Sequence, residues 1–158
     1  MLHQRPRSTV TPSNRVALAP RIRTLDGLPS IAPVVLAGEQ AARDYFASLF
    51  AERDPATETL FVAHLDSASR CLHLSQHGGD RRGAELPVRA ILTDALQFDG
   101  KGLILAHNHP SGDPSPSAAD RQATRRLALA CEAIGVTLLD HLVFGGGAWT
   151  SFRRIGLL

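Results

Sequence analysis

A short apolar run leads directly into a polar, proline-rich stretch in GLILAHNHPSGDPSPSAAD, residues 102–120. The apolar part, residues 102–106, is typical of a buried strand. Side chains two residues apart on an extended segment point to the same side, so His107 and His109 should project together from its end. The stretch therefore predicts a buried strand that presents two imidazole rings at one edge of a sheet.

A helix start follows the two histidines. Ser115 and Pro116 supply a hydroxyl N-cap and a proline at the first helical position, and an alanine-rich continuation follows. Ser117 and Asp120 stand three residues apart, so they share one face of the first helical turns. We therefore expect a carboxylate from this helix to lie near the two imidazoles from the strand.

Two imidazoles and one carboxylate are the protein ligands of a catalytic zinc site, which keeps its fourth position for water. His107, His109 and Asp120 provide this set. The alternative is that the histidines are loop residues and that the aspartate only complements a helix N-terminus. A lone H-x-H pair favours that alternative, whereas the complete spacing favours Zn²⁺ as a cofactor.

Zinc held in this way lowers the pKa of its bound water and polarises a carbonyl, which suits peptide or amide hydrolysis. Such a reaction also needs a general base, usually a carboxylate. Spacing alone does not rank the glutamates, which are Glu39, Glu52, Glu58, Glu85 and Glu132. The Ser117 hydroxyl is a candidate oxyanion donor, and simple N-capping of the helix explains it equally well.

Composition limits the class of protein. The chain has 158 residues, enough for one domain, and no apolar run reaches the roughly 18 residues of a membrane span. The start carries no apolar segment of the kind found in secretory signals. Cys71 and Cys131 form no C-x-x-C pair, which argues against a disulfide framework or a thiolate zinc site. We therefore expect a cytoplasmic protein.

The first 33 residues differ from the rest. They hold five prolines without helical or strand periodicity, which predicts a disordered leader, with the folded domain over residues 34–158. The leader's arginines are Arg5, Arg7, Arg15, Arg21 and Arg23. Such an arm is more often a solvated tail than a nucleic-acid contact, and a net charge of +2 is too small to indicate nucleic acid for the whole domain.

The pattern along residues 34–158 predicts an α/β fold with helices on the faces of a mixed sheet. We expect helices near residues 42–50, 91–98 and 117–134, and strands near residues 58–66, 71–74, 84–88, 102–106, 136–144 and 148–152. The oligomeric state is left open.

The central stretch resembles the JAMM/MPN+ metallopeptidases, whose signature is a distant Glu followed by H-[ST]-H-x7-S-x2-D. AHNHPSGDPSPSAAD and LLDHLVFGGG are most similar to the RadC-type branch. The resemblance implies a cytidine-deaminase-like three-layer α/β/α sandwich. It also implies a zinc-dependent metallopeptidase or isopeptidase that acts on a scissile amide of a peptide or protein. Its site residues would be a zinc set of His107, His109 and Asp120, an oxyanion-assisting Ser117 and an acid/base Glu58.

Some residues depart from the family or stay open. Asn108 stands where many isopeptidases have Ser or Thr, and the helix-hairpin-helix region that precedes the domain in RadC proteins is not seen. His141 either orients a metal ligand or is a core residue, and His64 and His73 are expected to be structural. An accessory, DNA-repair-type nucleic-acid protein is the competing hypothesis. A zinc nucleoside deaminase is disfavoured because H-x-E and P-C-x-x-C are absent.

Overall fold

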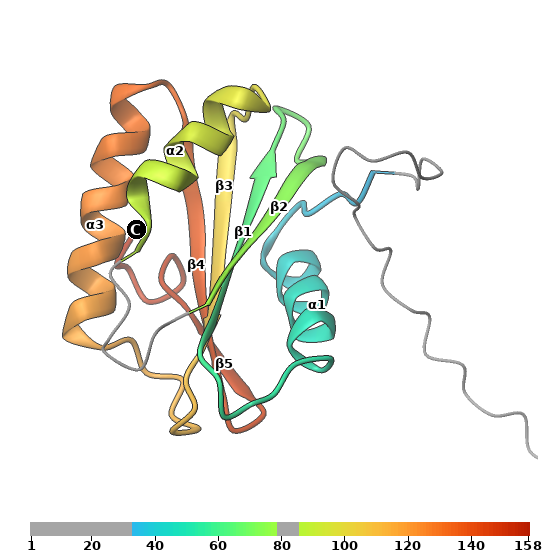
Figure 1. Cartoon of the computed structure of the whole chain (residues 1–158), viewed down its shortest axis with the longest axis vertical. Coiled ribbons are helices and arrows are strands. Elements are labelled where there is room, and N and C mark those ends of the chain that lie inside the picture. Colours follow the sequence, from blue (N-terminus) through green and yellow to red (C-terminus); the bar gives the residue numbers. More distant parts are fainter. Residues whose placement is uncertain (1–32, 79–85) are drawn as a thin grey trace, which may run out of the picture.

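A mixed five-stranded sheet separates α1 on one face from α2 and α3 on the other (Figure 1). The computed structural model describes residues 33–78 and 86–158. The elements are α1 (Glu39–Phe50), β1 (Thr59–Leu65), β2 (Cys71–Gly78), α2 (Val88–Gln97), β3 (Gly102–Asn108), α3 (Ala118–Ala133), β4 (Thr137–Gly145) and β5 (Ala148–Ser151). The strand order is β2-β1-β3-β4-β5. Only the β3–β4 pair is parallel, and the other neighbours are antiparallel.

Each face of the sheet has its own apolar core. Phe46 of α1 packs with Phe61 and Ile104 on one face, whereas Ile91 of α2 and Leu127 of α3 pack with the other. Successive side chains of a strand alternate between the two faces, so one buried strand contributes to both cores. The predicted mixed sheet and three-layer α/β/α arrangement are confirmed.

The amphipathic helices form where their periodicity predicts them. α1 buries Ala42, Tyr45 and Phe46 and ends at Phe50, before Pro55 can interrupt it. α3 buries Ala123, Thr124, Leu127 and Cys131. Most helical stability comes from burying such a stripe rather than from intrinsic propensity, which explains why the spacing was informative.

Two local predictions were wrong. Val88 starts α2 instead of ending a strand, because Pro87 adopts a φ of −75° at the N-cap and Ile91 and Ala95 then face the core. The N-cap of α3 is Ser117 rather than Ser115, because only Ser117 forms a reciprocal pair of hydrogen bonds with the residue three positions later.

The predicted leader falls almost wholly on residues 1–32, and the start of the expected 84–88 strand falls on residues 79–85, so both lie outside the described residues. Cys71 and Cys131 are buried and form no disulfide with each other. Across the described helices, none combines the length and apolar character needed to cross a membrane.

Candidate metal centre

His107 is held by the middle of the sheet. It lies on β3, opposite Leu60 of β1 and Val143 of β4, and only 4% of its surface is exposed. Strands on both sides fix the backbone at this position through ladder hydrogen bonds. The imidazole therefore projects from a rigid support on the α2/α3 face.

His109 is held by the loop that follows β3. Its backbone N–H donates to Phe144 O at 2.8 Å, and its Nδ1 lies 2.7 Å from Asp113 O. A carbonyl oxygen only accepts hydrogen bonds, so Nδ1 carries the proton and the Nε2 lone pair of the neutral ring is left available.

Glycines let the turn between β4 and β5 back onto this loop. A Cβ added to Gly146 would stand 2.7 Å from Gly112 O, and one added to Gly145 would stand 2.9 Å from the carbonyl carbon of Asp113. Any larger residue would displace the backbone, so the glycine-rich turn supports the carbonyl that orients His109.

Asp120 lies in the first turn of α3 and forms a capping box with Ser117. Ser117 N donates to Asp120 Oδ2 at 2.7 Å, and Asp120 N donates to Ser117 Oγ at 3.0 Å. The reciprocal hydrogen bonds fix the rotamer of Asp120, which makes the helix start a rigid support for the carboxylate.

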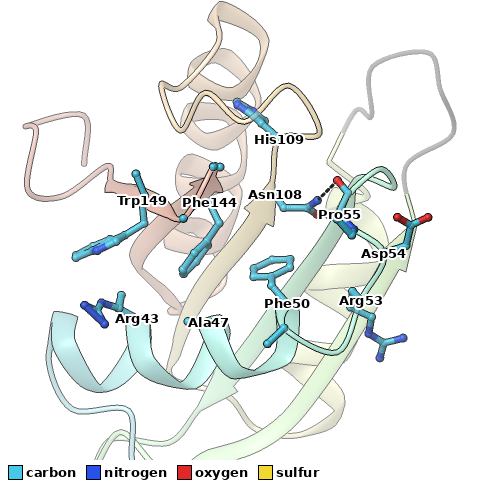
Figure 2. A pocket seen from close by; sticks show the side chains of 15 residues that line it. Arg43, Ala47, Phe50, Arg53, Asp54, Pro55, Asn108, His109, Phe144 and Trp149 are labelled. Carbon is cyan, nitrogen blue, oxygen red and sulfur yellow. Dashed lines mark hydrogen bonds between the residues drawn. The ribbon is translucent and has the colours of Figure 1, made fainter.

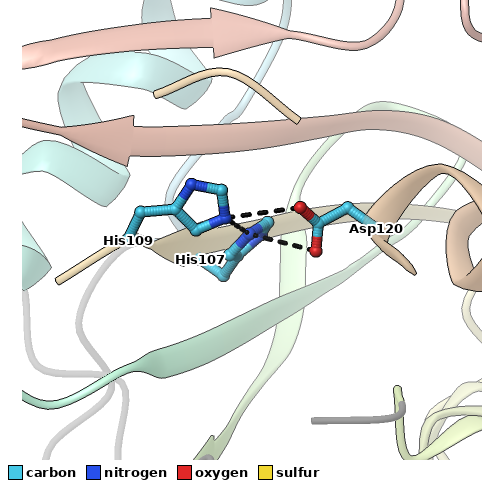
Figure 3. Close-up of side chains that lie close together, drawn as sticks. All are labelled: His107, His109 and Asp120. Atoms are coloured by element: carbon cyan, nitrogen blue, oxygen red, sulfur yellow. Dashed lines mark hydrogen bonds and ion pairs between the residues drawn. The ribbon is translucent and has the colours of Figure 1, made fainter. Parts of the chain in front are cut away.

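These three side chains converge (Figure 3). The Nε2 atoms of His107 and His109 are 2.9 Å apart, and Asp120 oxygens lie 3.5 Å and 3.3 Å from them. Their ligand atoms all lie within 4.8 Å of one another. Ligands bound tetrahedrally to zinc at about 2.0–2.1 Å stand roughly 3.3 Å apart, so the donor set fits this metal with small adjustments.

A buried chain of side chains stands behind His107. Its Nδ1 lies 2.8 Å from His141 Nε2, and His141 Nδ1 lies 2.7 Å from Thr124 Oγ1. In the tautomer that frees His107 Nε2, His107 donates to His141, which in turn donates to Thr124. The chain of hydrogen bonds thus supports the proton arrangement that metal binding requires.

Burial favours the neutral form of two imidazoles, those of His107 on β3 and His141 on β4. Desolvation lowers the pKa of His107 to about 4, although Asp120 opposes the shift. Desolvation likewise takes the pKa of His141 well below its usual value. Burial alone would raise the pKa of Asp120, but the hydrogen bonds from Ser117 help to lower it. Neutral rings and a charged carboxylate are the states that bind a metal cation.

Glu58 is not one of the three converging residues, and it lines the same cavity as His107, Asp120 and His141, about 410 Å³ in volume. Asn108 holds the backbone on both sides of it. Asn108 Oδ1 accepts from Thr59 N at 2.8 Å, and Asn108 Nδ2 donates to Thr57 O at 3.1 Å. One amide side chain therefore fixes the segment that carries Glu58.

Ser117 is the N-cap of α3, as its hydrogen bond with Asp120 N shows. Its side chain is exposed, its oxygen accepts in that bond, and the Asp120 carboxylate is a second partner of the hydroxyl. The capping alternative is thus observed, and the oxyanion role stays a prediction.

Sequence reasoning missed two supporting residues. Thr124 was not singled out because a threonine gives no apolar signal in a helix pattern. Asn108 was noted only as a departure from Ser or Thr. No local pattern indicated that Thr124 would contact His141 or that Asn108 would contact the segment around Glu58.

Comparison with known proteins places these features in a family. The family described as "RadC-like JAB domain" matches residues 36–157. A UPF0758 protein of Rhodobacter capsulatus is 42% identical over 128 residues, 78% of this chain and 58% of that protein. The UPF0758 protein YfjY of Escherichia coli K12 is 35% identical over 126 residues, 79% of this chain and 78% of that protein.

A UPF0758 protein of Symbiobacterium thermophilum is 54% identical over a shorter stretch of 70 residues, 44% of this chain and 30% of that protein. The chain thus spans less than two thirds of the length of several relatives that it matches. The match over residues 36–157 covers all the described helices and strands, from α1 to β5. The chain belongs to the RadC-like JAB domain family.

Proposed function

We propose that this chain is a zinc-dependent hydrolase that cleaves amide bonds in peptides or proteins, in the manner of a JAMM metallopeptidase. One observation carries the proposal: the Nε2 atoms of His107 and His109 and the carboxylate of Asp120 converge within 4.8 Å. With the Nδ1 protons directed elsewhere, two lone pairs would otherwise face each other at 2.9 Å, and a cation between them removes that repulsion.

The three converging residues would hold the zinc. When bound, zinc supplies a Lewis acid for the carbonyl and lowers the pKa of water. Glu58 would take the proton of the attacking water and deliver it to the leaving amine, since a general acid/base must act at the reacting atoms. Its place in the cavity shared with His107 and Asp120 supports this role.

The Ser117 hydroxyl would donate to the carbonyl oxygen as negative charge develops on it. Its neighbour Asp120 fixes its position through the capping box. His141 would orient His107 without touching the substrate. We further propose that the protein acts in the cytoplasm, in keeping with two buried cysteines that form no disulfide.

Metal analysis of the purified full chain tests the zinc site. We expect about one zinc per chain in the wild type and almost none in His109→Ala, because a structural or catalytic zinc needs at least three protein ligands. Unchanged zinc content in the variant would exclude the assignment.

Cleavage is tested with Glu58→Gln. The substrates are a set of synthetic decapeptides and one branched peptide with an ε-amide bond, and products are read by mass spectrometry. We expect the variant to retain zinc and to lose at least about 100-fold in cleavage rate, the usual contribution of a general acid/base. Equal rates for variant and wild type would remove Glu58 from the mechanism.

A further inference from the structure

A second cavity lies on the α1 face of the sheet, next to the metal centre. It has a volume of about 660 Å³ and runs between α1 and the β4–β5 hairpin (Figure 2). His109 borders this cleft, whereas His107 and Asp120 border the smaller cavity on the α2/α3 face. The residues of the metal centre therefore border both cavities, so a chain bound across the centre could extend into both.

The walls of the α1-side cleft are mainly apolar. Its apolar side chains are Ala47, Phe50, Ala51, Pro55, Phe144, Ala148 and Trp149. The volume falls in the range of about 300–1,000 Å³ that ligand pockets occupy. Gly145, Gly146 and Gly147 form one rim and add no side chain that would close it. The cleft is thus suited to a large apolar side chain attached to a slender backbone.

The charge of the lining is positive. The described lining residues include two guanidinium groups, those of Arg43 and Arg53, and one carboxylate, that of Asp54. Arg43 also contacts Asp44 at 2.7 Å, but both side chains are exposed, and such pairs contribute little. An acidic side chain beside the apolar one would complement this rim.

The aromatic rings of the cleft already have partners within the chain. Arg154 covers the Trp149 ring at 4.3 Å from its centroid. Phe50 packs against Phe61 at 5.2 Å and against Phe144 at 5.0 Å. Binding of single-stranded nucleic acid relies on stacking of bases against aromatic faces, and these contacts compete with such stacking.

We propose that the α1-side cleft binds an extended peptide segment of the substrate, one that carries a large apolar side chain next to an acidic one. This inference rests on the proposed amide hydrolysis and names its substrate class. The apolar side chain would lie between α1 and the β4–β5 hairpin, and the acidic one would face Arg43. The scissile amide would then reach the metal centre at His109.

Trp149 is the only tryptophan of the chain and lines the cleft, so its emission reports occupancy directly. The probes are capped ten-residue peptides of glycine and serine with Leu-Glu or Glu-Leu at the centre. Matched peptides replace Leu with Ser, or Glu with Gln. All of them lack tryptophan and tyrosine. Titrations use the full chain carrying Glu58→Gln, both zinc-loaded and metal-free.

We expect the Leu peptides to bind at least about 10-fold more tightly than the Ser peptides, since burying a leucine side chain contributes roughly 1.5–3 kcal/mol. The Glu peptides should bind about threefold more tightly than the Gln peptides at low salt and equally at 1 M salt, because exposed charges are screened. Equal binding of Leu and Ser peptides would overturn the proposal, and equal binding of Glu and Gln peptides would overturn its acidic part.

Ala47→Phe places a ring in the cleft from the α1 side, so it should weaken binding of the Leu peptides at least tenfold. Ala133→Phe, at an exposed position of α3, is the matched control and should leave binding unchanged. If Ala47→Phe does not fold, Arg43→Gln against Arg89→Gln tests the acidic preference. Equal affinities within both pairs would overturn the proposal. So would an emission change caused by a twelve-residue oligothymidylate but by no peptide.

Because binding to the metal-free protein is measured apart from cleavage, the two proposals fail differently. Tight binding of Leu peptides without any zinc or cleavage would refute the hydrolase and keep the cleft as a peptide site. If Leu and Ser peptides are cleaved at equal rates and Trp149 emission does not change, the cleft is not a peptide site. The proposed hydrolase activity would still stand.

Discussion

Two sets of two histidines and one aspartate lie on the same face of this sheet, at its opposite ends. The metal-end set is His107, His109 and Asp120, and the far-end set is His64, His73 and Asp94. The register shows the separation, because Leu60 on β1 pairs with His107 on β3, whereas His64 pairs with Leu103. The two sets share residue types and differ in the hydrogen bonds that orient their rings.

In the far-end set, the ring nitrogens lack support. Neither nitrogen of His64 has a hydrogen-bond partner among the described residues, although its ring is fully buried. Asp94 Oδ2 stands 4.0 Å from His64 Nε2 and 3.9 Å from His73 Nε2, and His73 stacks on Phe98 at 4.0 Å. At the metal end, a carbonyl and His141 hold the Nδ1 atoms. Ligand types alone do not make a site; their orientation does.

The largest expected effect separates Asp120→Ala from Asp94→Ala. The first should abolish zinc binding, from about one zinc per chain to less than about 0.1, because it removes one of three ligands. The second should leave zinc content unchanged. Metal analysis after dialysis measures both.

Asp120→Ala also removes the capping box, so Asp120→Asn accompanies it. The amide oxygen can still accept from Ser117 N, and the charge is lost. If Asp120→Ala retains zinc, or if Asp94→Ala loses it, the assignment of zinc binding to the metal-end set is wrong.

The next effect concerns the support of His107. Thr124→Val removes the hydroxyl that meets His141 Nδ1 at 2.7 Å while keeping the volume of the side chain. We expect zinc affinity to fall about 10-fold, the lower end of the cost of losing an outer partner, because Thr124 acts on His107 only through His141. Thr93→Val, at an exposed position of α2, is the control.

Competition with a chelator at fixed pH measures the zinc affinity. If Thr124→Val lowers the free energy of unfolding but leaves zinc affinity equal to that of the control, the hydrogen bond between Thr124 and His141 serves only the core. The metal end would then lack one of the hydrogen-bond supports that, as we propose, distinguish it from the far end.

The far-end set should make the stability of the protein depend on pH in the acid range. Burial lowers the pKa of His64 from 6.5 to about 4, against a smaller opposing contribution from Asp94. The folded protein therefore prefers the neutral ring, and the unfolded chain takes up a proton first as the pH falls. The contribution of His64 to the free energy of unfolding is complete above pH 6.5, declines between pH 6.5 and about 4, and changes no further below pH 4.

His64→Leu should reduce this acid sensitivity. Between pH 7.5 and 5.0 we expect the variant to lose about 2 kcal/mol less unfolding free energy than the wild type, from the linkage of the shifted pKa. Urea unfolding in a chelator measures the difference without interference from zinc. An identical loss in both proteins would show that His64 is not the residue that responds.

The sequence predicted the parts of the molecule that depend on strong periodicity or on fixed spacing. β3 was recognisable because a buried central strand must be apolar throughout, and α3 because its stripe recurs every three to four residues. The convergence of His107, His109 and Asp120 followed from the same two elements. Their zinc-binding role is still a prediction.

Features that depend on competition between neighbours escaped prediction. Residues 86–88 suit a short strand by composition, but Pro87 and the stripe of Ile91 and Ala95 favour a helix start. Ser115 and Ser117 are equivalent as helix caps until Asp120 selects one of them through its own hydrogen bond. Long-range partners such as Thr124 and His141, 17 positions apart, leave no local pattern.

Asn108 gives the smallest expected effect and the most specific one. Asn108→Ala removes the side chain that contacts Thr59 N and Thr57 O, and the free energy of unfolding should fall by about 1 kcal/mol, because water replaces these half-buried hydrogen bonds. Hydrogen exchange at Thr59 should quicken about fivefold, by local opening of this segment. Gln97→Ala, at the exposed end of α2, is the control.

Cleavage kinetics then separate two roles of Asn108. If it positions Glu58, kcat should fall about tenfold while KM and zinc affinity stay within about twofold, since a misplaced acid/base weakens only the chemical step. Faster exchange at Thr59 with unchanged kcat would mean that Asn108 fixes the start of β1 and not the glutamate. The metal end would then differ from the far end in its histidine supports alone, and the acid/base group would have to be held by other contacts.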